Sequence, residues 1–347
     1  MRSIAIVNQK GGVGKTTTAV NVSAALARAG QRVLLIDLDP QAHATMHLGI
    51  ELGPGDKSTY DVLLSGDTLR AAARQVAEGL TLVPGHIDLV AAEVELAERP
   101  ERELILARAL ETFSDPYDIL MIDGGPSLGT LTINALAAVE EVIIPLQPHF
   151  LALQGLGKLL ETVSLVRGVL KPALRVSGVV LCMYETNTRL AQEVRSDVSR
   201  FIRDAEFQDA WYGARVFETR IRRNIRLAEC PSFGQTIFDY APRSRGAEDY
   251  TALAGEILAM EEPGEVAEAP ATAMETPPSE VAADAEPPGV LAGPVSKPAD
   301  VPTGALNPYA APPTVTPAEY PTVGVTSPAG PPPPDRPDDR PDDGPAP

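Results

Sequence analysis

Short runs of apolar residues alternate with longer amphipathic stretches along the first 260 residues of the chain. The apolar runs predict strands at residues 3–8, 33–37, 80–84, 119–123, 141–145 and 176–183, with a further short strand at 235–239. The amphipathic stretches predict helices at 16–29, 102–113, 128–138, 153–169, 190–207 and 247–260, and Gly30 fits the C-terminal cap of the first. Strands that alternate with helices indicate an α/β fold, in which a mostly parallel twisted sheet is flanked by helices.

Polar side chains stand at the carboxyl ends of three of these predicted strands, namely Asn8, Asp37 and Asp123. Because parallel strands end at the same edge of a sheet, we expect these side chains to lie near one another. Ligands of open α/β sheets bind at that edge, so it is the predicted position of the functional site.

The composition changes after Met260. Residues 261–347 contain 23 of the 34 prolines and no periodic apolar run. This change predicts one globular domain at 1–260 and a disordered, acidic, proline-rich tail at 261–347. The prolines at 331–334 and the charged residues after them favour an extended polyproline conformation, which either recruits a partner or serves as a solubilising spacer.

The net charge of −18 is unevenly distributed, because the tail has 15 acidic and 3 basic residues, a net of −12, and the domain has the remaining −6. An acidic total therefore does not exclude DNA binding, which depends on where the charges lie. Cys182 and Cys230 form no CxxC pair, which indicates a reducing cytoplasm and neither a disulfide framework nor a metal site. We expect no signal peptide, since the first strand begins at Ser3, and no membrane span, since no run approaches about 18 apolar residues.

A glycine-rich segment joins the first predicted strand to the first predicted helix, and it reads Lys10-Gly11-Gly12-Val13-Gly14-Lys15-Thr16-Thr17. A strand, a glycine loop, a lysine, a hydroxyl residue and a helix, in this order, form the arrangement that binds nucleotide phosphates. Glycine allows backbone N–H groups to turn toward anionic oxygens where a Cβ would obstruct them. We expect Lys15 to meet the β- and γ-phosphates and the hydroxyl of Thr16 to ligate Mg²⁺.

Two acidic motifs follow the second and fourth predicted strands. Asp37 and Asp39 are two residues apart at a strand end, so they point the same way and can hold Mg²⁺ through water and orient the water that attacks the γ-phosphate. Capping of a following helix is the alternative role of this pair. Asp123 ends a buried aliphatic strand, as the acid of a Walker B motif does near Mg²⁺, and an unpaired carboxylate is expensive elsewhere in a core.

The glycine loop departs from the ordinary P-loop at two positions, because Gln9 stands where the first glycine is expected and Lys10 adds a second lysine. This is the deviant Walker A pattern. Together with the motifs at 37–41 and 119–128, it makes residues 1–260 resemble the ParA/MinD family of dimerising ATPases, most closely the chromosomal ParA/Soj branch. The resemblance implies a P-loop NTPase fold with ATP and Mg²⁺ as cofactors.

The resemblance also implies roles for individual residues. The implied catalytic residues are Lys10, Lys15, Asp39 and Asp123, of which Lys10 reaches across a homodimer to the partner's nucleotide and Asp39 is tied to hydrolysis. The implied metal site consists of Thr16, Asp39 and Asp123. ParA-like chains usually have proline where this chain has Gly125, so we expect a more flexible loop here.

Nine arginines are concentrated between residues 189 and 226, at positions 189, 195, 200, 203, 215, 220, 222, 223 and 226. Arginines neutralise DNA phosphates without reading bases. The predicted helix at 190–207 also carries acids, so its arginines either contact DNA or form a salt-bridged surface. The run from 220 to 226 contains no acid and favours DNA. The resemblance places nonspecific binding of double-stranded DNA by the ATP-bound dimer in this part of the chain, and the predicted contacts are Arg189, Arg220, Arg222, Arg223 and Arg226.

The resemblance as a whole implies a cytoplasmic, nucleoid-associated partition ATPase whose weak hydrolysis is stimulated by a ParB-like centromere-binding partner. One alternative is a relative that positions another cargo, such as a chemosensory cluster or a microcompartment, and another is a nucleotide-gated regulator with little turnover. A membrane-associated regulator of the division site is disfavoured, because the domain runs into Glu261-Glu262-Pro263 and not into a basic amphipathic helix.

Overall fold

The computed structural model describes residues 1–260, and the predicted tail lies outside the described residues. The strands are β1 (Arg2–Ile6), β2 (Val33–Leu38), β3 (Arg74–Ala77), β4 (Leu80–Val83), β5 (Ile119–Gly124), β6 (Glu141–Leu146), β7 (Arg175–Tyr184), β8 (Arg215–Val216) and β9 (Ile221–Arg222). The α-helices are α1 (Lys15–Arg28), α2 (His43–His47), α3 (Thr59–Leu64), α4 (Leu69–Ala72), α5 (Leu89–Leu96), α6 (Ile105–Glu111), α7 (Thr130–Ala137), α8 (Ala152–Val169), α9 (Arg189–Arg203), α10 (Ile225–Glu229), α11 (Ile237–Tyr240) and α12 (Arg245–Leu258). Short 3-10 helices span Arg102–Leu104 and Cys230–Phe233.

The strands form one sheet in the order β3-β4-β2-β5-β1-β6-β7-β8, and β9 adds to β7 beyond the end of β8. Every pairing is parallel except that of β3 with β4. The residues of β2, β5 and β6 are all buried, as expected for parallel strands that helices cover on both faces. The predicted α/β class is therefore confirmed.

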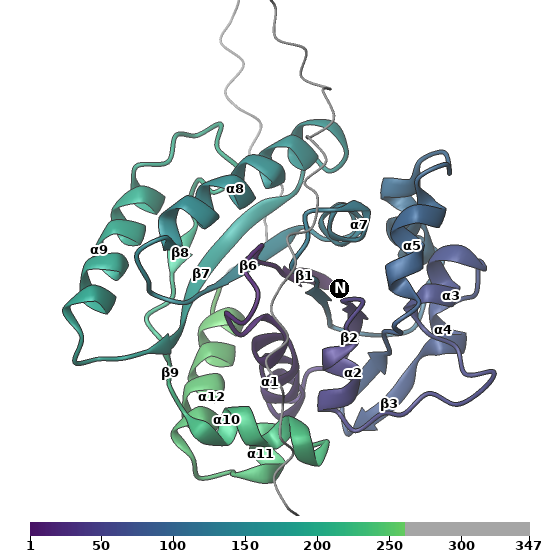
Figure 1. Ribbon diagram of the computed structural model, residues 1–347, viewed down its shortest axis with the longest axis horizontal. Helices are drawn as coiled ribbons and strands as arrows, with labels where there is room; N and C mark the ends of the chain where they lie inside the picture. The colour runs from purple at the N-terminus through teal and green to yellow at the C-terminus, as the bar shows by residue number, and fades with distance from the viewer. Residues whose placement is uncertain (261–347) are drawn as a thin grey trace, which may run out of the picture. The chain divides into compact units, whose positions relative to one another are not determined.

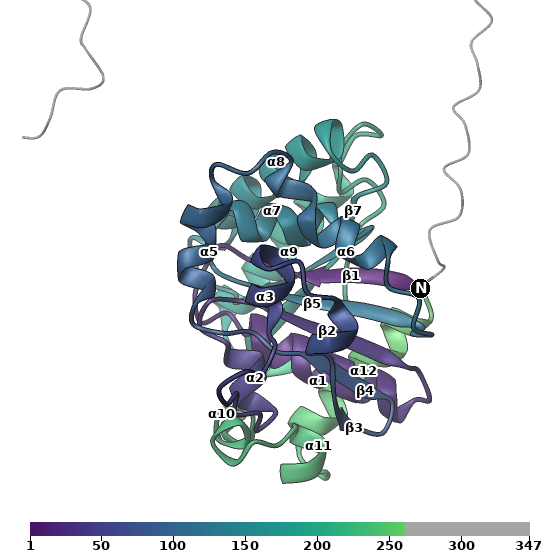
Figure 2. The same ribbon diagram turned by 90° about the vertical axis from the view of Figure 1, so that its right-hand side faces the viewer.

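Two apolar cores lie on the two faces of the sheet. Alternate residues of the first strand face opposite ways, so Ile4 and Ile6 join the core under α1 and α12, while Ala5 and Val7 join the core under α7, α8 and α9. Figures 1 and 2 show α1 and α12 on one side of the sheet and α7 and α8 on the other. β1 lies between β5 and β6, so the loop after it opens where neighbouring crossovers turn to opposite faces.

Six of the seven predicted strands and four of the six predicted helices appear in the structure within a few residues of the expected bounds. The strand at 235–239 and the helices at 102–113 and 190–207 differ. The predicted strand at 235–239 is wrong: the segment forms the helical turn α11, because the Thr236 hydroxyl donates to Asp239 (2.6 Å) and the Ile237 N–H is held by Asn21 (2.8 Å). Gly30 adopts a φ of 90° after α1, as expected for a helix C-terminal cap.

The predicted helix at 102–113 is divided into a 3-10 turn and α6. The side chain of Asn134 bonds to the backbone of both segments: it accepts from the Leu106 N–H of α6 (3.1 Å) and donates to the Arg102 carbonyl of the 3-10 turn (2.7 Å). These backbone groups therefore do not bond to each other as they would within one continuous helix. The predicted helix at 190–207 ends at Arg203, and Phe207 lies exposed in the following loop. Short elements without a clear period were not predicted, namely α2, α3, α4, α5, α10, β3, β8 and β9.

Candidate nucleotide-binding site

The glycine loop lies between the end of β1 and the start of α1. Gly12 and Gly14 have φ angles of 73° and 92°, a region in which other residues are strained, so these two glycines are required by the turn. Gly14 is the N-cap of α1 and provides no side chain to cap it. The first N–H groups of this 14-residue helix therefore have no capping partner and point from the helix end into the loop, which favours an anion there.

The lysines of the loop occupy different environments. Lys15 is buried, its Nζ donates to the Lys10 carbonyl (3.1 Å), and burial lowers its pKa while Asp123 and Asp39 oppose the shift. Lys10 is exposed, and its Nζ lies 2.6 Å from Nε2 of His149 in the loop between β6 and α8. Asn8 fixes the loop's entry, because it accepts from the Lys10 N–H (3.0 Å) and donates to the Pro145 carbonyl (2.7 Å).

The parallel register brings the acids of two strands together. β2 pairs with β5 so that Asp37 lies beside Asp123, and β1 pairs with β5 so that Ile6 lies beside Asp123. The site thus gathers the ends of three adjacent strands, as the sequence predicts.

Asp37 serves the local structure. Its carboxylate accepts from the backbone N–H and the hydroxyl of Thr45 (2.8 and 2.6 Å) and from the Asp39 N–H (3.2 Å). Burial raises the pKa of Asp37 to about 6 in spite of these bonds. These contacts hold α2 against the end of β2, and they place the buried Asp39, whose Oδ1 accepts from the Gln41 N–H (2.9 Å). Thr45 was not predicted, since a threonine in a short helix gives no sequence signal.

Asp123 is the least satisfied group of the site. It is 0% exposed, and neither carboxylate oxygen has a hydrogen-bond partner. Burial and the neighbouring Asp37 raise its pKa well above the usual range, although the nearby Thr16 hydroxyl and the Lys15 charge oppose the shift. A buried, unpartnered carboxylate beside two others is unfavourable in the protein alone, and a divalent cation would remove the cost.

The donors present fit Mg²⁺ bound together with a phosphate chain. No group of three or more His, Cys, Asp or Glu residues suited to hold a metal occurs in residues 1–260. Mg²⁺ commonly takes only one or two protein ligands and completes its shell with phosphate oxygens and water. Thr16 stands at the start of α1 beside Asp123, as the predicted metal site requires, and Thr17 is half-buried next to it.

The loop after β5 touches the loop after β2. A Cβ built on Gly125 would lie 3.5 Å from Pro40 and 3.7 Å from the Asp39 carboxylate, so a side chain there is compatible with the space. Greater flexibility at Gly125 stays a prediction. Ser127 in the same loop donates to Glu93 of α5 (3.2 Å).

The predicted DNA-contacting arginines lie near the same edge of the sheet. Cys182 of β7 lies next to Gly14 of the glycine loop, 3.6 Å from where a Cβ of Gly14 would be, and it pairs with Ile221 of β9, which precedes Arg222 and Arg223. Arg223 is 78% exposed and pairs with Glu185 (3.2 Å), in the loop that leads to the exposed Arg189. Arg226 pairs with Glu229 (3.0 Å) and lies over the ring of Tyr240. Arg220 lies over the ring of Tyr184.

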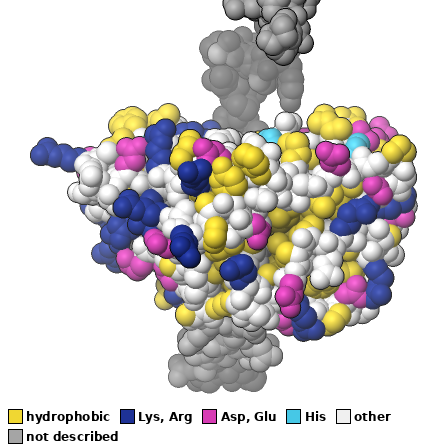
Figure 3. Space-filling view, turned by 90° about the horizontal axis from the view of Figure 1, so that it is seen from below, with side chains coloured by type: hydrophobic (Ala, Val, Ile, Leu, Met, Phe, Trp, Pro, Cys, Tyr) yellow, Lys and Arg dark blue, Asp and Glu magenta, His cyan; other side chains and the backbone are white. Residues whose placement is uncertain are grey.

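Arg222 differs from its neighbours. Its guanidinium holds both oxygens of the buried Asp249 (2.5 to 3.1 Å), and its backbone N–H donates to the same carboxylate (2.9 Å). On α9, Arg195 pairs with Glu218 and Arg200 with Asp197. Figure 3 shows basic side chains dispersed among acidic ones on the face seen from below. DNA contact by the predicted arginines stays a prediction.

Comparisons with known proteins agree with this geometry. Residues 1–176 match a family model described as an AAA domain. The sporulation initiation inhibitor protein Soj of Bacillus subtilis is 47% identical over 257 residues, which are 74% of this chain and 98% of Soj. The chromosome-partitioning ATPase Soj of Thermus thermophilus is 46% identical over 75% of this chain and 96% of its own. This chain belongs to the Soj/ParA family of chromosome-partitioning ATPases.

Solved structures show the same fold. A Mycobacterium smegmatis protein named cobyrinic acid a,c-diamide synthase, solved with an ATP analogue and magnesium, is 37% identical with a TM-score of 0.63 over 74% of this chain and 94% of its own. MinD of Pyrococcus horikoshii, solved with Mg-ADP, is 25% identical with a TM-score of 0.56 over 74% of this chain and 95% of its own. The predicted P-loop fold is confirmed. No helix in residues 1–260 of this Soj/ParA member combines the length and apolar character that a membrane span needs.

Proposed function

We propose that this Soj/ParA chain is a partition ATPase that dimerises around ATP and Mg²⁺, binds DNA nonspecifically as the dimer and releases it after hydrolysis. The observation that carries the proposal is the buried, unpartnered carboxylate of Asp123 beside the glycine loop. Such a group is costly in a protein that binds no cation at this position.

The proposal gives separate roles to Lys15 and Thr16 of the glycine loop and to Asp123 and Asp39 at the strand ends. The N–H groups at the start of α1 and the ammonium of Lys15 would bind the phosphates, and Thr16 and Asp123 would hold the cation. Mg²⁺, when bound with ATP, neutralises charge that develops on the phosphates. Asp39 orients the attacking water, since it lies at the end of β2 with one oxygen bound to the Gln41 N–H.

Dimerisation completes the site. Lys10 is exposed, so it is available to a second protomer, and its charge would stabilise the partner's phosphates during hydrolysis. Hydrolysis by a lone protomer is then weak. A ParB-like partner would stimulate it by favouring the complete site.

DNA binding follows from the dimer. One protomer offers few phosphate contacts, and the dimer doubles them, so the affinity for DNA depends strongly on the nucleotide. The proposed contacts are Arg189, Arg220, Arg223 and Arg226, with Arg222 supporting them from its ion pair with Asp249. The proposed location is the cytoplasm, on the nucleoid.

The test is the binding of the full chain to an unrelated 30-base-pair duplex, measured by fluorescence anisotropy with ATP, with ADP and without nucleotide across a salt series. We expect binding with ATP alone that weakens steeply with salt and does not depend on sequence. Equal binding in all three nucleotide states would contradict the proposed coupling. Absence of binding in every state would assign the arginines to a solvated surface and leave a DNA-independent nucleotide switch.

A further inference from the structure

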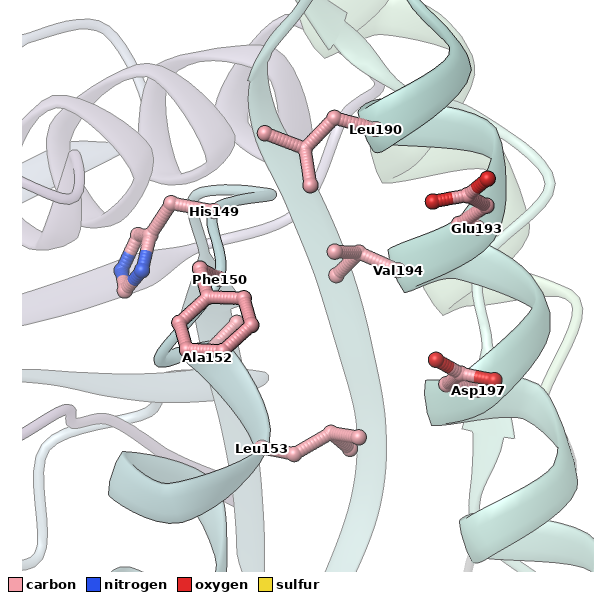
Figure 4. A pocket seen from close by; sticks show the side chains of 8 residues that line it. All are labelled: His149, Phe150, Ala152, Leu153, Leu190, Glu193, Val194 and Asp197. Carbon is pink, nitrogen blue, oxygen red and sulfur yellow. The ribbon is translucent and has the colours of Figure 1, made fainter.

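His149 lies where the glycine loop meets the start of α8. Its Nε2 is 2.6 Å from the Lys10 Nζ of the same protomer, although the two residues are 139 positions apart. Figure 4 shows His149 and Phe150 on the loop that enters α8, with Leu190 and Val194 of α9 across a cleft of about 210 Å³. The charged group next to the ring is Lys10 from the glycine loop, and Glu193 and Asp197 of α9 line the far side of the same cleft.

Two donors compete for this ring. The Leu151 N–H is directed at Nδ1 (3.1 Å), and Lys10 is directed at Nε2 (2.6 Å). A neutral imidazole has a single lone pair, and an ammonium group can only donate. Burial and the Lys10 charge lower the pKa of His149, so the ring is neutral at pH 7.5. It therefore accepts from Lys10 or from Leu151, but not from both at once.

We propose that His149 is a positioning residue, which holds Lys10 within its own protomer and releases it to the partner's nucleotide. This inference rests on the proposed function, since the action of Lys10 across a dimer belongs to it. In the held state Nδ1 carries the ring proton and Nε2 accepts from Lys10. In the released state the ring exchanges its proton with solvent, Nε2 carries it, and Nδ1 accepts from Leu151.

The released state also changes the start of α8. Leu151 is the N-cap residue of this helix and has no side chain that could cap it. Its N–H already lies 3.1 Å from Nδ1 of His149, and because the departure of Lys10 leaves Nδ1 as the only acceptor in use on the ring, that departure strengthens this bond and stabilises the first turn of α8. Phe150, which is 88% exposed beside that turn, would then be fixed at the mouth of the cleft.

The test compares His149→Ala, which cannot hold Lys10, with His149→Glu, which holds it more tightly through a charge. Dimerisation of the full chain with Mg²⁺ and ATP is measured by sedimentation velocity. We expect the dimer constant to tighten about threefold to tenfold in His149→Ala and to weaken by a similar factor in His149→Glu, because one hydrogen bond is lost or strengthened. His149→Gln retains one acceptor and is expected near the wild type.

The control is Gln154→Glu, which adds the same charge at an exposed position of α8 and is expected to leave dimerisation unchanged. If the wild type dimerises and His149→Glu dimerises as well as His149→Ala, the inference is wrong. If the wild type does not dimerise with ATP, the proposed function fails.

A second measurement tests the contact without a dimer. The chain has four histidines, so the imidazole nitrogens can be followed individually by NMR during a pH titration. Lys10→Ala is expected to raise the pKa of His149, because a neighbouring positive charge is removed. An unchanged pKa would overturn the held state whatever the dimer measurement gives.

Discussion

The nucleotide edge of the sheet and the arginine segment at 220–226 differ in whether their charged side chains are buried and whether they are paired. At the nucleotide edge, Asp37 and Asp123 are buried side by side, and Asp123 has no hydrogen-bond partner. In the arginine segment, Arg223 and Arg226 are exposed, and each is paired with an acid of the same chain. Arg222 is intermediate between the two regions, because its side chain is half-buried and is paired with the buried Asp249.

The difference shows what each region requires. Buried acids that lie side by side, one of them without a hydrogen-bond partner, favour a cation, so the nucleotide edge is incomplete without one. Exposed, paired arginines are complete without a ligand and gain little from their pairs in water. They can exchange a carboxylate for a phosphate at small cost, so the proposed DNA binding would be weak in each contact and sensitive to salt.

The largest effect is expected from Lys15→Ala. The substitution removes the buried ammonium that would meet the phosphates, and a charge-assisted bond of this kind contributes about 2–4 kcal/mol, or roughly 30-fold to 1,000-fold in ATP affinity. Isothermal calorimetry measures the loss, with the exposed Lys158→Ala as the matched control. ATP affinity within threefold of the wild type would remove Lys15 from the phosphate site.

Asp39→Ala separates binding from hydrolysis. We expect ATP affinity to be retained and turnover to fall about 10²-fold to 10³-fold, because the water on the γ-phosphate loses its orienting group. Phosphate release measures turnover, and sedimentation shows whether the dimer accumulates. Turnover equal to that of the wild type would mean that another group orients the water.

Asp123→Asn tests the buried acids through stability. The pKa values of Asp37 and Asp123 are raised in the folded, cation-free protein, so folding favours their protonated forms. This contribution to stability is complete below the ordinary carboxyl pKa of about 4 and is lost as the pH rises through the raised values, about 6 for Asp37. At pH 7.5 without Mg²⁺, the variant is therefore expected to melt roughly 2–6 °C higher than the wild type, with a smaller gain at pH 5.

The matched control for this variant is Asp118→Asn. Arg32 lowers the pKa of Asp118 to about 2, so the sign is reversed, and this substitution is expected to lower the melting temperature at pH 7.5. Scanning calorimetry measures both variants. A lower melting temperature for Asp123→Asn at pH 7.5 would show that its carboxylate is compensated in the cation-free protein.

The smallest effects distinguish neighbouring arginines. Arg222→Ala is expected to destabilise the protein by about 1–3 kcal/mol, because it leaves Asp249 buried without its partner. Arg223→Ala is expected to change stability by less than about 0.5 kcal/mol and to lower the salt dependence of DNA binding by about one ion per protomer. Urea unfolding measures stability, and fluorescence anisotropy across a salt series measures DNA binding. A larger loss of stability in Arg223→Ala than in Arg222→Ala would contradict the contrast between a paired, exposed arginine and one that holds a buried acid.

The sequence predicted the parts of the molecule that depend on strong, local patterns. Continuous apolar runs marked β2, β5 and β6, and the spacing of the glycines and lysines marked the loop before α1. The parallel arrangement then implied that Asp37 and Asp123 meet, and the register places them side by side.

The remaining features depend on contacts between distant segments. The contact between Lys10 and His149 joins residues far apart in the chain, and a lone histidine after a strand gives no signal of it. The turn at α11 is stabilised by Thr236 and by Asn21 of α1, which override a β-branched composition. The burial of Asp249, which distinguishes Arg222 from Arg223, follows from the packing of α12.

The most direct test mixes two inactive variants, Lys10→Ala and Asp39→Ala, in equal amounts before ATP is added. In a mixed dimer, the Lys10→Ala protomer keeps Asp39 and receives Lys10 from its partner, so one complete site forms. We expect the mixture to recover about a quarter of wild-type turnover, since half of the dimers are mixed and each has one complete site of two. Turnover no higher than the mean of the separate variants would contradict a site shared between protomers.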